Sequence, residues 1–396
     1  MIMTQRKSFQ SYMNILNINK LILVTLLAIM LPGLLLGLFG VSYAVSTILV
    51  IVTSALIFFH SDGTWKIRTS NLTIILIFFI GYLITVVYFR HTINLHIHIS
   101  LIIFTLLVFC VLAASISRNQ AVSHSETLLL GWTAVMILLI NLFSNFNFYS
   151  EPSHLGAYVV PFACLVPYLS STFKKTLHIL LLIILLFQFS ITILVAWTLT
   201  ILLLGAANVR GIIAVILLVS AAVSLVFYFD TRWAHHLSDL VYLLNASKAS
   251  NLTVLVFIQG YEYIMYSLAN FNIFGTGLDT LEQIALSSPA YSRLDAMGYP
   301  LNRSDGGLGL ARISVELGSL ITVILVIYVA LLAYKIIKTS SNCPSSSLAK
   351  TMFVVVIINL FLRGGGIFDP SIVYLILISK LIVKNEKKSN DYNISS

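Results

Sequence analysis

Apolar stretches long enough to cross a membrane recur along the whole of this 396-residue chain. A helix needs about 20 mainly apolar residues to cross the ~30 Å hydrocarbon core of a bilayer. Only 9% of the residues are charged, against roughly 25% in soluble domains, so the chain lacks the polar surface of a water-exposed protein. Blocks such as LHILLLIILLFQF do not alternate as the strands of a β-barrel would. The sequence therefore predicts an all-α polytopic membrane protein.

Run lengths and polar interruptions predict about twelve transmembrane helices. The stretch 176–205 is too long for one helix, and we divide it at Ser190. Pro161 and Pro167 fall inside the sixth helix, where neighbouring helices can satisfy the carbonyls that proline leaves unbonded. The predicted helices are centred on residues 20–38, 43–59, 72–89, 98–116, 128–146, 155–170, 176–189, 191–205, 212–229, 313–334, 350–362 and 371–383.

Lysine and arginine predict the orientation, because cytoplasmic loops are enriched in them. Placing both termini in the cytoplasm puts most of the 23 basic residues inside. The chain then divides into transmembrane helices 1–9 (residues 1–229), a long outer loop (230–312), and transmembrane helices 10–12 with a cytoplasmic tail (313–396). The net charge of +9 is spread singly along loops, so we expect no nucleic-acid partner. The three cysteines lie too far apart to indicate a disulfide framework or a metal site.

The segment SEPSHLG, residues 150–156, lies on the outer side in this orientation. Pro152 suits the first turn of a helix that begins near Ser153. One interpretation is that Ser150 or Glu151 caps this helix and that His154 lies among the lipid headgroups. The alternative is that both face an outward hydrophilic cavity, where His154 binds a phosphate or a sugar hydroxyl and Glu151 accepts a proton or orients the histidine.

The outer loop contains eight of the 14 acidic residues, between positions 230 and 316. Its segment LTVLVFIQGYEYIMYSLANF predicts an amphipathic helix that lies on the bilayer or caps the bundle. Tyr261 and nearby tyrosines either stack on sugar rings or belong to an interfacial aromatic belt. The following FGTG is a lone G-x-G and does not indicate a nucleotide site.

Basic residues near the end of this loop are candidates for binding phosphate. Arginine forks match phosphate oxygens, and we expect Arg303 to bind a lipid diphosphate, with Arg293 in the same segment. Arg312 is spaced i, i+4 from Glu316 on the predicted tenth helix, which suits either an ordinary ion pair or an anion site. Arg363 either joins this group or extends along apolar surface to the interface.

The order of these motifs resembles that of the Wzy-type O-antigen polymerases, in the polymerase/ligase superfamily. EPSH opens a middle helix and is followed by FS-x-T, formed by Phe189, Ser190 and Thr192. The outer-loop segments IQGYEYIMYSLANFNIFGTGLDTL and LNRSDGGLGLARISVELG then follow in the same order. The resemblance covers about residues 130–375, while the first third of the chain matches only in hydropathy.

This resemblance implies a GT-C-like bundle and a metal-independent glycosyltransferase at the periplasmic face of a bacterial inner membrane. Such enzymes polymerise oligosaccharide repeat units carried on undecaprenyl diphosphate, during lipopolysaccharide biosynthesis. A hydroxyl of a new unit attacks the anomeric carbon of the growing chain, and undecaprenyl diphosphate leaves. The implied partners are a chain-length regulator protein and a flippase, and no cofactor is implied. The candidate bases are Glu151, His154 and Asp305, and the candidates for binding the diphosphate or sugar are Arg303, Arg312, Arg363, Tyr261 and Arg293.

Three alternatives stay open. The first is an O-antigen ligase or another lipid-linked glycosyltransferase. O-antigen ligases share the architecture but carry Ser-Arg where this chain has Ser190-Ile191, which disfavours a ligase. A transporter of polysaccharide or lipid-linked oligosaccharide also suits about twelve helices, but transporters place ionisable residues near the midplane and show internal repeats. A non-enzymatic assembly protein would have no need of so many paired polar groups.

Overall fold

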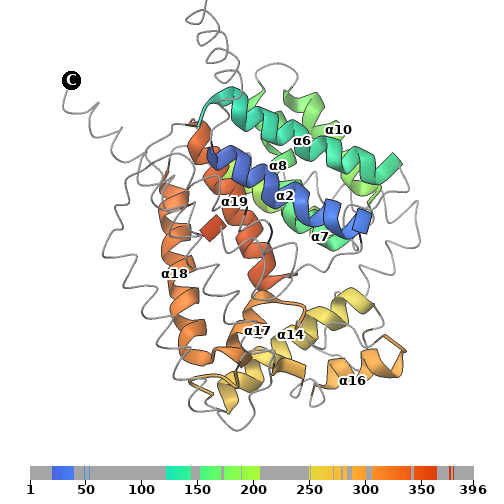
Figure 1. Ribbon diagram of the computed structural model, residues 1–396, viewed down its shortest axis with the longest axis vertical. Helices are drawn as coiled ribbons and strands as arrows, with labels where there is room; N and C mark the ends of the chain where they lie inside the picture. Colours follow the sequence, from blue (N-terminus) through green and yellow to red (C-terminus); the bar gives the residue numbers. More distant parts are fainter. Residues whose placement is uncertain are drawn as a thin grey trace, which may run out of the picture.

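The computed structural model describes residues 20–39, 49, 53, 122–143, 152–170, 174–188, 190–205, 249, 251–270, 272–277, 280–282, 288–299, 306–339, 343–363, 374, 375 and 378. Every regular element in these ranges is a helix, which confirms the predicted all-helical class (Figure 1). The helices are α2 (Lys20–Phe39), α6 (His124–Phe143), α7 (Pro152–Tyr158), α8 (Val160–Ala163), α9 (Leu165–Leu169), α10 (Lys174–Leu186), α11 (Ile191–Gly205), α14 (Leu252–Ala269), α16 (Pro289–Ala296), α17 (Gly309–Glu316), α18 (Ser319–Lys338) and α19 (Pro344–Phe361).

Four helices in the described part of the chain are long and apolar enough to cross a membrane: α6, α14, α18 and α19. Their number and composition are those of a helical membrane protein. Helix α14 is the least apolar of the four, and it is the segment that the sequence predicts as a surface or capping helix. The predicted helices at 72–89, 98–116 and 212–229 lie outside the described residues, as do most of those at 43–59 and 371–383.

The predicted tenth helix, 313–334, is wrong at its start. Residues up to Glu316 belong to the separate helix α17, and α18 begins only at Ser319. The break is at Gly318, whose φ of 92° is open to glycine but strained for other residues. Arg312 and Glu316 therefore lie on a buried helix of their own and not at the outer end of a transmembrane helix.

The predicted sixth helix, 155–170, forms as the three short helices α7, α8 and α9. Pro161 and Pro167 have no N–H to donate to the preceding turn, so the helix is interrupted near each of them. Bonds such as Val159 N–H to the Leu155 carbonyl (3.0 Å) and Ala163 N–H to the Val159 carbonyl (3.1 Å) carry the helical path across the interruptions. The segment is therefore one distorted helix that stays almost entirely buried.

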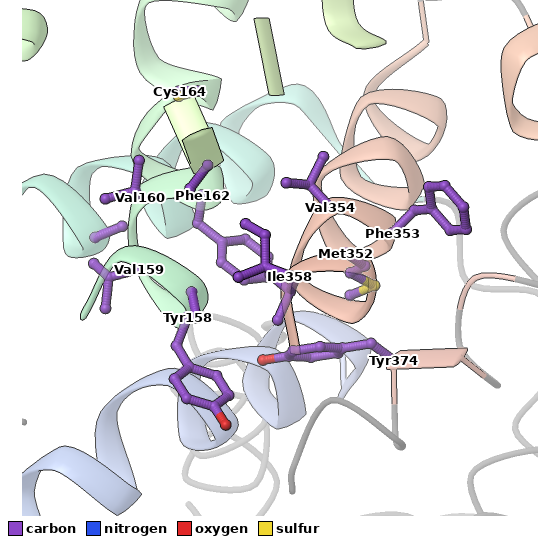
Figure 2. Packing of buried hydrophobic residues seen from close by; sticks show 14 of the residues in the cluster. Tyr158, Val159, Val160, Phe162, Cys164, Met352, Phe353, Val354, Ile358 and Tyr374 are labelled. Atoms are coloured by element: carbon purple, nitrogen blue, oxygen red, sulfur yellow. The ribbon is translucent and has the colours of Figure 1, made fainter. Parts of the chain in front are cut away.

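Helix α19 is the centre of the bundle. Most of its side chains are buried, and it packs against α11, α8, α7, α9 and α6 on one side and α17 and α18 on the other. Figure 2 shows Phe162 of α8 against Val354 and Ile358 of α19, and its ring lies 5.8 Å from that of Tyr374. By contrast, α18 exposes a stripe of apolar side chains along one face, as a helix bordering lipid would.

One buried polar contact ties α10 to α6 within this apolar bundle. The side-chain N–H of Asn141 donates to the Gln188 side-chain oxygen at 3.1 Å, and the Gln188 amide donates to the Leu138 carbonyl at 3.3 Å. Because each amide has a partner, the polar groups are tolerated among apolar neighbours. Gln188 lies two residues after the end of α10 at Leu186, so the contact joins the turn that follows α10 to α6.

Helices α14, α16 and α17 gather at one end of the bundle, the lower end in Figure 1. Their side chains form two apolar clusters separate from the main core, one around Tyr263, Leu308 and Val315 and the other around Leu255 and Leu294. Helix α14 packs chiefly on α16 and α17. Helix α14 thus shares this end of the bundle with α16 and α17.

We expect Gly156→Ala to destabilise the protein. A Cβ at this position of α7 would lie 2.9 Å from the Ile193 backbone nitrogen and 3.0 Å from its Cα, so α7 and α11 would have to separate. Overpacking of this kind costs about 1–3 kcal/mol. Thermal unfolding in detergent should show a lower midpoint.

Gly205→Ala is the matched control, because a Cβ there, at the end of α11, meets nothing within 4 Å. Alanine is also the better helix former, so this variant should unfold at or slightly above the wild-type temperature. Equal midpoints for the two variants would contradict the close approach of α7 to α11.

Candidate functional site

The start of α7 lies toward the carboxyl end of α19. Figure 2 shows Phe162 of α8 beside Val354 and Ile358 of α19, and Figure 1 shows α7 below α8, nearer to α14. The end of α19 also lies beside α14, because the Tyr261 hydroxyl donates to the Phe361 carbonyl. His154, one turn before Tyr158, is therefore at the end of the bundle where α19 finishes. Its ring centroid is 6.4 Å from that of Tyr158, at a tilted angle.

The EPSH and FS-x-T segments meet in space. Helices α7 and α11 cross where Gly156 approaches Ile193, and Ser190 and Thr192 are buried at the start of α11. Ser153 is buried as well, whereas His154 is partly exposed. Two motifs more than 30 residues apart in the sequence thus come together at one end of the bundle.

Helix α17 fits between α14 and the end of α19. A Cβ on Gly309 would lie 3.0 Å from the Asn359 carbonyl oxygen, so glycine permits the approach of α17 to α19. On the other side, Gly260 of α14 leaves room for Leu308 and the Gly306 carbonyl. All eight residues of α17 are buried by these contacts.

Tyr261 and Arg363 are brought to the same place. The Tyr261 hydroxyl of α14 donates to the Phe361 carbonyl at the end of α19, at 3.4 Å. Two residues later, the backbone N–H of Arg363 donates to the Ile358 carbonyl at 2.8 Å. Only 5% of this arginine is exposed. The side chain is buried within the protein, which does not fit an arginine that extends to the interface.

Arg312 forms a buried ion pair with Glu316. The Arg312 Nε lies 3.0 and 3.1 Å from the two carboxylate oxygens, and Glu316 has no exposed surface. Such a pair gives α17 one rigid polar face in an apolar setting. Of the two interpretations of the i, i+4 spacing, the structure contains the ion pair.

The carbonyls at the end of α17 are capped by residues 272–277. The Thr276 N–H donates to the Val315 carbonyl at 2.8 Å, and the Gly277 N–H to the Glu316 carbonyl at 3.1 Å. The Ser267 hydroxyl donates to the Ser314 carbonyl. A Cβ on Gly275 would collide with the Glu316 carbonyl, so this glycine of FGTG permits a close backbone approach, while Gly277 adopts a φ of 100° that favours glycine.

Arg293 lies apart from this junction, on α16. Its Nε donates to the Ala249 carbonyl at 2.7 Å. Glu262 of α14 holds the start of the same helix, since its carboxylate accepts from the Ser288 hydroxyl at 2.6 Å and from the Ala290 N–H at 3.1 Å. The structure thus engages Arg293 in anchoring α16.

Glu151, Arg303 and Asp305 lie outside the described residues. Asp305 directly precedes Gly306, which is buried against Leu281 and Tyr263. The described junction therefore consists of the end of α19, α17 and the face of α14 that carries Tyr261, with His154 and Ser190 at the same end of the bundle.

Sequence reasoning did not single out three residues that contribute to this end of the protein. Glu262 is engaged at the start of α16, Gln259 donates to the Tyr263 hydroxyl at 2.6 Å, and Asn359 donates to the Val355 carbonyl at 2.9 Å. Gln259 and Asn359 are isolated amides within apolar runs, FIQG and IINL, and that isolation is the signal that marks them.

The described residues contain no cluster of His, Cys, Asp and Glu side chains that could hold a metal ion. No protein-family model matches the chain, and no curated protein or solved structure matches it.

We expect the single variants Arg312→Met and Glu316→Leu each to be strongly destabilised, because each leaves one buried charge without its partner. Breaking a buried pair in this way costs about 3–5 kcal/mol. The double variant removes both charges, so its thermal unfolding midpoint should lie above those of both single variants. A double variant less stable than either single one would contradict the pairing.

Proposed function

We propose that the chain is a Wzy-type O-antigen polymerase, a metal-independent glycosyltransferase that works on undecaprenyl-diphosphate-linked repeat units. It acts at the periplasmic face of the bacterial inner membrane, with both termini in the cytoplasm. The observation that carries the proposal is convergence. The motifs of the resemblance come from α7, α11, α14 and α17. Helices α7, α11 and α17 all pack against α19, and α14 packs on α17.

The chemistry of this end suits a reaction with a diphosphate leaving group. A hydroxyl of the incoming unit attacks the anomeric carbon of the growing chain. Its proton passes to a base, and the bond to the diphosphate breaks with the electron pair leaving on oxygen. Cations stabilise the charge that develops on that oxygen. We assign this role to Arg303 and Arg363, and the role of base to Glu151, His154 or Asp305.

The pairing of Arg312 with Glu316 favours a positioning role for this arginine. The pair stiffens α17, and α17 is the helix that follows directly after Arg303 and Asp305 in the sequence. Tyr261 holds the face of α14 against the end of α19 through the Phe361 carbonyl. In this proposal both residues keep the substrate-binding groups at fixed places.

Deletion of the gene tests the proposal and separates it from its alternatives. Loss of a polymerase should leave lipid A-core with a single repeat unit on a lipopolysaccharide gel. Loss of a ligase should leave lipid A-core with none, and loss of a flippase should likewise abolish transfer. A normal ladder after deletion would overturn both the polymerase and the ligase hypotheses.

We expect Arg363→Ala to collapse the ladder while Arg363→Lys retains part of it, because lysine keeps the charge but not the fork geometry. Removing one hydrogen-bond donor to a developing oxyanion lowers turnover by about 10²–10³-fold. Glu151→Ala and Arg303→Ala should collapse the ladder in the same way. Immunoblots of membranes must show that each variant still inserts.

His154→Ala should also shorten the ladder, and its matched control is His124→Ala. His124 is an exposed histidine at the start of α6, toward the other end of the bundle, so its loss should leave chain length unchanged. Full-length chains from the His154 variant would remove this residue from the candidate bases.

A further inference from the structure

The amino-terminal turn of α19 is a polar site at the opposite end of the helix from Arg363. An α-helix of 18 residues is about 27 Å long. Helix α19 opens with the sequence CPSSSLAKT, and its five polar side chains are all buried. Their exposed fractions are 7% for Ser345, 1% for Ser346, 0% for Ser347, 4% for Lys350 and 0% for Thr351.

The Ser346 hydroxyl differs from its neighbours. Ser347 donates to the Cys343 carbonyl at 3.3 Å, and Thr351 donates to the Ser347 carbonyl at 2.9 Å. Within the described residues, the Ser346 Oγ is buried and has no hydrogen-bond partner. A buried hydroxyl of this kind calls for a specific explanation, because nearly all such groups in proteins are bonded.

The helix end supplies further donors beside this hydroxyl. The side chain of Cys343 makes no capping hydrogen bond, and Pro344 has no N–H. Helix geometry leaves the N–H groups of Ser345 and Ser346 without an intrahelical acceptor, at the positive end of the helix dipole. Because Cα–Cβ bonds tilt toward the start of a helix, the Ser346 hydroxyl is aimed at the same place.

Lys350 adds a positive charge where the helix end is already positive. It follows Ser346 by four residues and so lies on the same helix face. Residues 343–363 contain no Asp or Glu.

We infer that this turn binds a phosphate-type anion. The N–H groups of Ser345 and Ser346, the hydroxyl of Ser346 and the ammonium of Lys350 hold it. Helix amino termini are general anion sites, and the ammonium of a lysine on the same helix face adds to the attraction for an anion. The anion is either the headgroup phosphate of a membrane lipid or inorganic phosphate. This inference does not depend on the proposed function, since it concerns the other end of α19.

The test measures binding by the purified full-length protein in two arms. In neutral detergent, the unfolding temperature is followed against inorganic phosphate at constant ionic strength. In nanodiscs of phosphatidylglycerol or phosphatidylcholine, native mass spectrometry counts the lipid that stays bound. A rise in unfolding temperature with phosphate, without retained lipid, identifies free phosphate as the ligand. Retained phosphatidylglycerol, without an effect of phosphate on the unfolding temperature, identifies a lipid headgroup. Absence of both overturns the inference.

Variants connect binding to the named groups. Lys350→Met removes a charge-assisted hydrogen bond and should weaken binding at least about tenfold, and Ser346→Ala about threefold. The controls are Ser347→Ala, whose hydroxyl is bonded to Cys343, and Lys338→Met, an exposed lysine at the end of α18. Both should bind as the wild type does.

If Lys350→Met does not insert, Lys350→Arg replaces it and should retain binding while Ser346→Ala still weakens it. Wild-type affinity in both Ser346→Ala and Lys350→Met would show that the anion binds elsewhere and would overturn the inference. Where Lys350→Arg replaces Lys350→Met, wild-type affinity in Ser346→Ala overturns it.

Discussion

The arrangement of α14, α17 and the end of α19 depends on hydrogen bonds to the last carbonyls of α17, which water cannot reach. All of α17 is buried, so the groups that a helix normally leaves to solvent must be bonded inside the protein. Residues 272–277 and Ser267 supply those bonds. This clasp, formed by Ser267 and residues 272–277, holds α17 against α14. The close approach of Gly309 to Asn359 sets the distance from α17 to α19. Tyr261 and Arg363 come together because these three helices are fixed in this way.

The bounds of several helices can be predicted from the sequence, because the hydropathy pattern alone determines them. Helices α2, α10 and α11 begin and end within a few residues of the predicted bounds. The start of α18 was not predictable in this way, since the hydropathy of residues 313–334 is continuous and the break comes from backbone contact at Gly318. That contact joins positions more than 40 residues apart, which no local pattern reveals.

The candidate site shows the same division. The i, i+4 spacing correctly indicated that Arg312 and Glu316 face each other, because helix geometry brings such residues together. Spacing said nothing of Tyr261 and Phe361, which meet through packing alone. The anchoring of α16 by Glu262 and of Arg293 by Ala249 is likewise a product of tertiary structure. Composition placed these residues in one loop, and only the fold separates those at the junction from those that hold the loop together.

The two glycines at the clasp have a consequence for how this chain can change during evolution. A side chain at Gly275 would strike the backbone near Glu316 and Gly318, and a side chain at Gly318 would strike the backbone of Ile273 and Gly275. Neither position can accept another residue while the backbone segment that faces it keeps its place. Substitutions at the two positions are therefore coupled in evolution. Related sequences that share this fold should keep both glycines, or lose both together with the segment between α14 and α16.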